Sequence, residues 1–229
     1  MNLQATLDQA RHITFMTGAG VSTASGIPDY RSKNGIYAGH QNPEYLLSAD
    51  NLRDHPESFY QFVKENMYFP DAQPNIIHTQ MAKIANQKGD IITQNVDGLH
   101  TKAGAEHVIE FHGNLNRIYC QTCGQQFTTA EYLQSDRHAA DHGILRPDIV
   151  LYGEAIDPDA VADSITAIQA ADVIMIVGTS FQVYPFAGLI QYRQPDAKLI
   201  AVNEEQLQFP FPVEMIQGDA VNVFAQLKE

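Results

Sequence analysis

The sequence predicts an α/β fold: a parallel sheet with helices on both faces and a smaller inserted lobe. Short apolar runs alternate with helical patterns along the chain, which is typical of a parallel sheet. Two segments with few apolar runs interrupt this alternation. The 229 residues suffice for one large domain or for a domain with an inserted lobe.

Six apolar runs are the predicted strands, and three segments with helical spacing are the predicted helices. The strands are expected at residues 13–16, 90–93, 108–111, 149–152, 173–177 and 199–202. The helices are expected at residues 76–85, 158–170 and 219–228.

The two interrupting segments are expected to form the smaller lobe. Residues 30–75 are rich in Tyr, Pro, Asn and Asp, with one helical patch at 59–66, and residues 114–146 contain both cysteines. We therefore expect residues 1–229 to be one domain, with a cleft between sheet and lobe as the ligand site. Its sheet-forming part is expected at about 1–29, 76–113 and 147–229.

The net charge limits the expected binding partners, and the N-terminal sequence limits the expected cellular location. A formal net charge of −13 argues against nonspecific binding of nucleic acid or anionic membranes, and is compatible with a lysine-rich peptide. The N-terminal segment lacks the pattern of a signal peptide, and the longest apolar run is shorter than the ~20 residues of a membrane span. We expect a soluble, cytoplasmic protein.

A glycine-rich turn follows the first predicted strand. Gly18 and Gly20 would let backbone amides approach a pyrophosphate, as in Rossmann-type folds. Thr23 stands where a dehydrogenase has its third glycine, and no second strand with an acidic end follows ~20 residues on. The turn therefore indicates a dinucleotide site outside the hydride-transfer enzymes. Taken alone, it could be a structural βα turn, and the next loop, with Asp29 and Arg31, could hold only a solvated salt bridge.

Polar side chains follow the next two predicted strands. Asn95 and Asp97 come after residues 90–93, and His112 comes after 108–111. Ligands lie at the carboxyl ends of strands in such sheets, and a histidine can serve there as a general base. Taken singly, Asn95 and Asp97 could merely cap a helix near residue 98, and His112 could be a surface histidine.

Five sequence blocks together resemble the sirtuin family. They are residues 18–31, 94–100, 112–113, 178–185 and 202–203, in the family's order. The resemblance implies a Rossmann domain, a small lobe that often carries zinc, and NAD as co-substrate. It implies removal of acyl groups from protein lysines, with release of nicotinamide and O-acyl-ADP-ribose.

The resemblance also assigns site residues. It makes His112 the general base, with Asn95 and Asp97 as the other catalytic residues. The acylated peptide would lie as a strand between Val150–Glu154 and Gln182–Tyr184, by β-augmentation. The implied NAD site consists of Ala19, Thr23, Tyr30, Arg31, Gln94, Val96, Asp97, Thr179, Ser180, Asn203 and Ala220.

The chain departs from the family pattern in the small lobe. Relatives usually carry two Cys-x-x-Cys pairs, whereas only Cys120 and Cys123 are present here, and His138 and Asp141 stand where the second pair would be. Zinc accepts all these ligand types, and His142 is a further candidate. We nevertheless expect weak or absent zinc and assign no metal residues. Tyr30 also stands where the family usually has Phe.

The resemblance to the sirtuin family also predicts which acyl groups are removed. Relatives that prefer acidic acyl groups carry a Tyr and, three residues later, an Arg; the matching positions here are Tyr60 and Val63. Neutral acyl groups, acetyl above all, are therefore expected.

A mono-ADP-ribosyltransferase and a non-catalytic NAD or ADP-ribose sensor are the alternatives. The presence of both Asn95 and His112 favours deacylation.

Overall fold

The computed structural model describes residues 2–33, 35–39 and 42–228, so residues 1 and 229 of the expected domain, and 34, 40 and 41 of its expected lobe, lie outside the described residues. A parallel six-stranded sheet forms the larger part of the molecule, in the order β3-β2-β1-β7-β8-β9. The strands are β1 (Ile13–Thr17), β2 (Gly89–Thr93), β3 (Val108–Glu110), β7 (Val173–Val177), β8 (Lys198–Asn203) and β9 (Glu214–Gln217).

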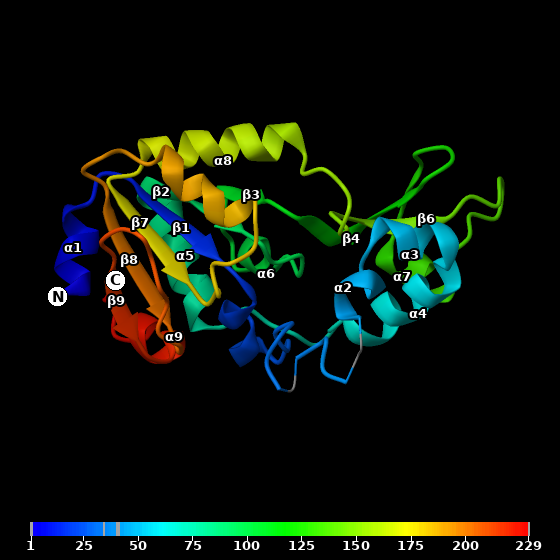
Figure 1. Ribbon diagram of the computed structural model, residues 1–229, viewed down its shortest axis with the longest axis horizontal. Coiled ribbons are helices and arrows are strands. Elements are labelled where there is room, and N and C mark those ends of the chain that lie inside the picture. The colour runs from blue at the N-terminus through cyan, green and yellow to red at the C-terminus, as the bar shows by residue number, and fades with distance from the viewer. Residues whose placement is uncertain (1, 34, 40–41, 229) are drawn as a thin grey trace.

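Helices cover both faces of this sheet, as Figure 1 shows, which confirms the expected fold class. The central strands β1 and β7 are buried along their whole length, because neither face of a parallel sheet is left to water. One face packs against α1 (Leu3–Gln9), α5 (Ile76–Lys88) and α9 (Ala220–Phe224). The other packs against α8 (Pro158–Ala170) and the 3-10 helix η3 (Phe186–Tyr192).

The strand order reverses at β1. The chain passes from β1 to β2 and β3 on one side, and later fills the other side with β7, β8 and β9. The carboxyl end of β1 therefore lies at the switch point, where open α/β sheets place their ligands.

A second, antiparallel sheet lies at the other end of the molecule (Figure 1), in the order β5-β4-β6. Its core draws on two distant stretches of chain, including Phe59, Val63, Ile118 and Tyr132. The strands are β4 (Gly113–Cys120), β5 (Gln126–Phe127) and β6 (Leu145–Ile149), and the helices around them are α2 (Pro43–Leu46), α3 (Ala49–Asp54), α4 (Pro56–Asn66) and α7 (Thr129–Gln134).

Some expected elements were wrong. The run 149–152 is no strand of the parallel sheet: Ile149 ends β6, and Tyr152 pairs through its backbone with Leu47 and Ala49 in the small lobe. The last helix ends at Phe224 rather than at 228.

Other elements were missed by the sequence patterns. The edge strand β9 is only half-buried, so its apolar signal is weak, and α1 is short. The glycine-rich turn leads into two 3-10 turns, η1 (Ala19–Val21) and η2 (Thr23–Ser25), in place of a helix. Among the described residues, no helix has the length and apolar character needed to cross a membrane.

Candidate active site

The carboxyl edge of the parallel sheet brings together side chains from five strand ends. Ala19 follows β1, Asn95 follows β2, His112 follows β3 and Thr179 follows β7, while Asn203 ends β8. The parallel strands end at the same edge, so these positions share one side of the sheet.

The glycines of the first turn are required by close packing. A Cβ added to Gly18 would lie 2.7 Å from the Thr179 Cβ, and one added to Gly20 would lie 2.8 Å from the Gly178 Cα. The Gly20 amide donates to the Gly178 carbonyl at 2.8 Å. The turns after β1 and β7 are therefore locked together, and Ala19 is held at the edge of a hollow.

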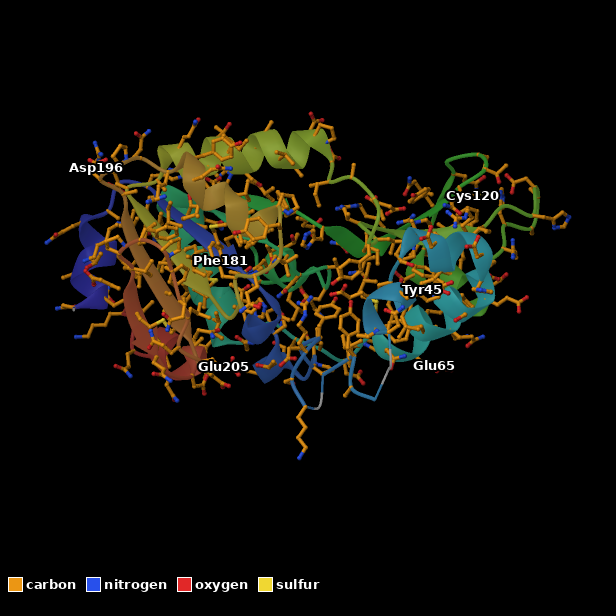
Figure 2. The ribbon with its side chains drawn as sticks, viewed as in Figure 1. Tyr45, Glu65, Cys120, Phe181, Asp196 and Glu205 are labelled. Carbon is orange, nitrogen blue, oxygen red and sulfur yellow. The ribbon has the colours of Figure 1, made fainter. Side chains whose placement is uncertain are left out.

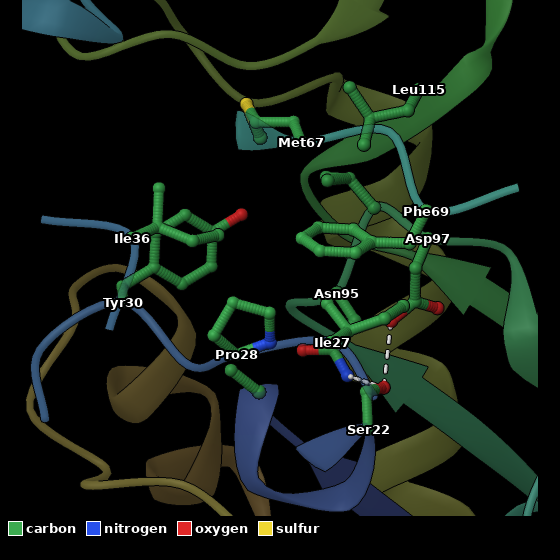
Figure 3. Close-up of a pocket in the computed structure, with 12 residues that line it drawn as sticks. Ser22, Ile27, Pro28, Tyr30, Ile36, Met67, Phe69, Asn95, Asp97 and Leu115 are labelled. Atoms are coloured by element: carbon green, nitrogen blue, oxygen red, sulfur yellow. Dashed lines mark hydrogen bonds between the residues drawn. The ribbon is translucent and has the colours of Figure 1, made fainter. Parts of the chain in front are cut away.

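This hollow has an empty volume of about 340 Å³, open solvent included, and lies between the glycine-rich turn and the small lobe (Figure 3). Most of its walls are apolar, and the polar groups gather on one side. It is lined by Ala19, Ser22, Ile27, Pro28, Tyr30, Ile36, Met67, Phe69, Asn95, Val96, Asp97 and Leu115.

Ser22 joins Asn95 and Asp97 into one hydrogen-bonded unit (Figure 3). Its hydroxyl donates to Asp97 Oδ2 at 2.7 Å and accepts from Asn95 Nδ2 at 3.1 Å. Asn95 Nδ2 also donates to the Gly18 carbonyl at 3.0 Å. A carbonyl only accepts, so this atom is the amide nitrogen, and Oδ1 stands outside both bonds.

Asp97 binds the first amide of the short helix α6 (Leu99–Lys102) and also lines the hollow. Its Oδ1 accepts from the Leu99 amide at 2.8 Å, so the capping alternative describes one of its two oxygens. Burial raises the pKa of Asp97, while the bonds from Leu99 and Ser22 act in the opposite direction. The carboxylate is therefore a partly desolvated acceptor whose charge depends on its donors.

Two histidines lie beneath this unit, fully within the protein. His78 Nε2 approaches the Ser22 hydroxyl at 3.4 Å, and its Nδ1 accepts from the Asn75 amide. His100 Nε2 lies 3.0 Å from Thr17 Oγ1. Burial lowers the pKa of His78 to about 4 and that of His100 to about 3, so both rings are neutral near pH 7. His100 is 2% exposed and is not among the residues that line the hollow.

His112 is oriented by the backbone of the neighbouring strand end. Its Nδ1 lies 3.3 Å from the Gln94 carbonyl oxygen, which only accepts, so Nδ1 carries the proton and Nε2 keeps its lone pair. Burial lowers the pKa of His112, with the Gln94 bond opposing this shift. A neutral imidazole with a free nitrogen is the form that a general base needs.

The remaining predicted NAD residues divide into two groups. Val96 and Tyr30 line the hollow, and Gln94 reaches across the edge, because its Oε1 accepts from Thr179 Oγ1 at 2.9 Å. The exposed Arg31 forms a salt bridge with Glu44 and donates to the Tyr152 hydroxyl, both at 3.4 Å. Asp29, the partner considered as an alternative, instead accepts from the Arg31 backbone amide at 2.9 Å. Outside the hollow lie Thr23, Thr179, Ser180, Asn203 and Ala220.

The two segments expected to hold a peptide differ in how their backbones are occupied. Tyr152 donates to the Leu47 carbonyl and accepts from the Ala49 amide, and the Val150 amide donates to the His112 carbonyl. In the other segment, Gln182 and Tyr184 are exposed. The 150–154 segment therefore has fewer backbone groups left for a partner strand.

Sequence reasoning missed several residues of the hollow. Ser22 lies inside the glycine-rich motif, and a hydroxyl one turn past the glycines is the signal that could have found it. Met67, Phe69 and Leu115 carry no such signal, because they are ordinary apolar residues whose position depends on how the small lobe packs.

Comparison with known proteins places these features in a family. The Sir2 family model matches residues 18–185. An NAD-dependent protein deacetylase of Listeria monocytogenes serotype 4b is 57% identical over 226 residues, covering 98% of this chain and 99% of the relative. One from Staphylococcus aureus is 41% identical over 234 residues, covering 98% of this chain and 96% of the relative.

Solved structures agree with this result. A Sir2 protein with a p53 peptide and NAD⁺ has a TM-score of 0.83 at 32% identity, covering 99% of this chain and 97% of that one. Another, with a deacetylated p53 peptide and 3′-O-acetyl-ADP-ribose, has a TM-score of 0.88 at 33% identity, covering 98% of this chain and 96% of that one. The chain belongs to the Sir2 family.

Proposed function

We propose that this chain removes acetyl groups from lysine side chains of proteins, consuming NAD and one water and releasing nicotinamide, the free lysine and an O-acetyl ester of ADP-ribose. The observation that carries the proposal is that Asn95 and Asp97 line the hollow beside the glycine-rich turn, while His112 follows the next strand at the same carboxyl edge of the sheet. The relatives named above are NAD-dependent protein deacetylases, and they match nearly the full length of this chain.

The residues present suit NAD. The hollow joins apolar walls to the half-buried acceptor Asp97, a combination that fits a flat ring carrying a carboxamide. We assign the nicotinamide half to this hollow and the adenosine half to Thr179, Ser180, Asn203 and Ala220 along the same edge. When bound, NAD supplies a ribose carbon that becomes electrophilic as nicotinamide leaves.

Asn95 and Asp97 act as positioning and binding groups in this scheme. Both Asn95 bonds hold its amide nitrogen to the protein, which leaves Oδ1 to accept from a ribose hydroxyl or a water. Asp97 accepts from the nicotinamide carboxamide. Ser22 fixes the distance between the two side chains, so it pre-organises the site before ligands bind.

His112 is the general base. Its Nε2 takes a proton from a hydroxyl of the reacting sugar, while the Gln94 carbonyl holds Nδ1–H and thereby the ring orientation. The base is needed after nicotinamide has left. A protein that only binds NAD or ADP-ribose does not need a general base.

The substrate lysine is presented on a peptide. We infer that the peptide lies between Val150–Glu154 and Gln182–Tyr184, with main-chain bonds made chiefly by the second, more exposed segment. The net charge of −13 suits a lysine-rich partner better than nucleic acid or an anionic membrane. The two-part division into a sheet domain and a lobe, and a cytoplasmic location, stay predictions; cell fractionation tests the latter.

Tyr60 and Val63 support a preference for neutral acyl groups. Val63, where relatives that favour acidic acyl groups have Arg, is fully buried, and the Tyr60 hydroxyl donates to the Tyr132 carbonyl at 3.0 Å. The described lining of the hollow includes no lysine or arginine. An acyl carboxylate would therefore be desolvated without a cationic partner.

The test incubates the protein with NAD and an acetyl-lysine peptide and follows all products by mass spectrometry. Deacetylation predicts equal amounts of nicotinamide, deacetylated peptide and O-acetyl-ADP-ribose. An ADP-ribosyltransferase would instead add ADP-ribose to the peptide, and a sensor would bind NAD without releasing nicotinamide. Either of these outcomes contradicts the proposal.

A further inference from the structure

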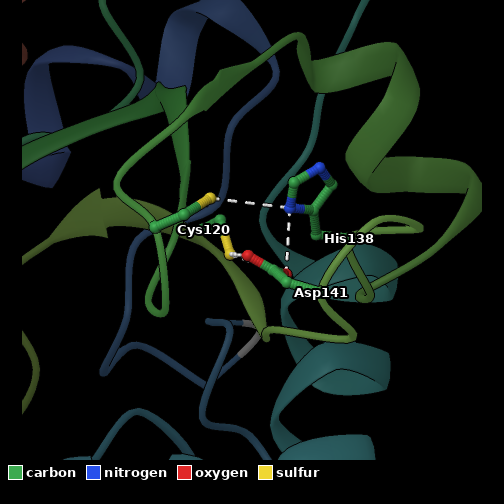
Figure 4. Close-up of side chains that lie close together, drawn as sticks. Cys120, His138 and Asp141 are labelled. Atoms are coloured by element: carbon green, nitrogen blue, oxygen red, sulfur yellow. Dashed lines mark hydrogen bonds and ion pairs between the residues drawn. The ribbon is translucent and has the colours of Figure 1, made fainter.

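Four potential metal ligands meet at the end of the small lobe, in a cluster made of Cys120, Cys123, His138 and Asp141 (Figure 4). One ligand atom from each lies within 4.8 Å of the others. The two cysteines come from the turn between β4 and β5, and the other two residues come from the loop between α7 and β6. Figure 2 shows Cys120 at the opposite end of the molecule from Asp196, far from the parallel sheet.

The spacing of these atoms suits a tetrahedral ion. Cys120 Sγ lies 3.6 Å from Asp141 Oδ1, and Cys123 Sγ lies 3.5 Å from His138 Nδ1. Ordinary zinc–ligand bond lengths in a tetrahedron place a sulfur and a nitrogen or oxygen about 3.6 Å apart. His138 Nδ1 and Asp141 Oδ1, at 2.9 Å, need to separate by only about 0.5 Å to reach their tetrahedral spacing.

Backbone hydrogen bonds close the turn that carries the two cysteines. The Cys120 amide donates to the Gln125 carbonyl at 2.9 Å. Gly124 closes the turn in the left-handed region, at φ 73°, and its amide donates to the Cys120 carbonyl. These bonds fix the backbone positions from which the two thiols project.

The second loop approaches the sulfurs closely because of a glycine. A Cβ added to Gly143 would lie 2.5 Å from Cys120 Sγ and 2.6 Å from Thr122 Oγ1. The Gly143 amide donates to Asp141 Oδ1 at 2.8 Å, and its carbonyl accepts from the His138 amide at 2.9 Å. The same glycine therefore admits the loop and positions both of its ligands.

We propose that this chain binds a structural zinc ion through Cys120, Cys123, His138 and Asp141, in place of the four cysteines usual in the family. The sequence predicts weak or absent zinc because two cysteines are missing, but the geometry brings in a nitrogen and an oxygen where they would be. Four protein ligands leave no open position, so the ion serves the fold and takes no part in the reaction. Two thiolates hold zinc less firmly than four, so strong chelators remove it.

Zinc would join the exposed loop to the core of the lobe. Cys120 is fully buried in the same core cluster as Tyr132 and Leu145, whereas Asp141 and its neighbours are exposed. Removal of the metal is expected to lower the melting temperature and to expose the 135–143 loop to proteases, since the loop otherwise has few apolar contacts.

The test measures metal content in protein carrying no histidine tag, after gel filtration in zinc-supplemented buffer. We expect one zinc per chain, and a cobalt-substituted sample with the sulfur-to-cobalt charge-transfer absorption of thiolate ligation. Cys123→Ser, His138→Gln and Asp141→Asn should each weaken zinc binding by at least about tenfold. Cys123 is exposed, so its replacement leaves the core intact.

His142→Asn is the matched control. His142 is the adjacent histidine outside the cluster, at φ 58°, a conformation that asparagine tolerates. It should keep full zinc content. Folded wild-type protein that takes up no zinc or cobalt, or His138→Gln and Asp141→Asn variants that bind zinc as tightly as wild type, would overturn the proposal. These readouts are independent of the proposed deacetylase activity.

Discussion

Replacing Ser22 with alanine removes a hydroxyl that connects two proposed catalytic side chains. The change deletes the 2.7 Å bond to Asp97 and the 3.1 Å bond from Asn95, in a residue that is 1% exposed. Hydrogen bonds to charged groups contribute about 1.5–3 kcal/mol. Loss of one at the transition state corresponds to a fall in kcat/KM of roughly 10- to 100-fold.

The pH dependence of Ser22→Ala gives a second readout. The Ser22 bond lowers the pKa of Asp97, which burial raises, so its removal raises that pKa further. The acidic limb of the kcat/KM profile, to which protonation of both Asp97 and His112 contributes, should therefore move to higher pH. Steady-state kinetics with NAD and an acetyl-lysine peptide measure both effects.

Ser164→Ala is the control for this experiment. Ser164 is fully buried, and its hydroxyl donates within α8 to the Ala160 carbonyl, on the helix layer away from the hollow. The variant should lose stability without losing activity. If Ser22→Ala keeps kcat/KM within twofold of wild type and an unchanged pH profile, the view that Ser22 organises the site is wrong.

Three further predictions follow from the site. First, burial lowers the pKa of His112, so kcat/KM for the wild type should stay high down to a pH below the ordinary histidine value of about 6.5, where protonation of the base then reduces it; an acidic limb centred above pH 7 would contradict this. Second, acetyl-lysine should be turned over roughly 100-fold better than succinyl-lysine on the same peptide, because Val63 offers a carboxylate no partner; equal kcat/KM values would refute the reasoning. Third, His78 and His100 have pKa values of about 4 and about 3 in the folded protein, below their values in the unfolded chain. The stability that depends on their neutral rings is therefore fully present above pH ~6.5, and it is lost as the pH falls from there towards the folded pKa values. Urea titrations should show the free energy of unfolding falling by about 1 kcal/mol per pH unit for each histidine, and His100→Gln should reduce that slope.

The strands of the parallel sheet could be predicted well where they are buried on both faces. Residues 173–177 are apolar at each position, and their predicted limits match β7. The edge strand β9 escaped prediction because one side meets water, which breaks up the apolar run. Residues 149–152 look like a buried strand for a different reason: they pack into the small lobe, and a run of four apolar residues carries no sign of which core it joins.

The candidate site likewise contains residues that could be predicted from the sequence and residues that could not. Asn95, Asp97 and His112 could be placed together from sequence, because parallel strands end at one edge and a residue just past each end must lie there. Met67, Phe69 and Leu115 could not, since they reach the hollow only through the packing of the small lobe. The cluster of Cys120, Cys123, His138 and Asp141 could be predicted only in part. The sequence spacing identifies these four residues as candidate ligands, but only the folded loop shows that their ligand atoms lie close together.

The proposal rests most directly on His112, so the decisive measurement is the product balance of His112→Ala beside the wild type. Binding of NAD, followed by calorimetry, should be retained, because His112 is bonded to the Gln94 backbone and lies outside the lining of the hollow. Deacetylated peptide and O-acetyl-ADP-ribose should fall by about 10²–10⁴-fold, the contribution of a general base. Near wild-type formation of both products by a folded His112→Ala protein would contradict the account.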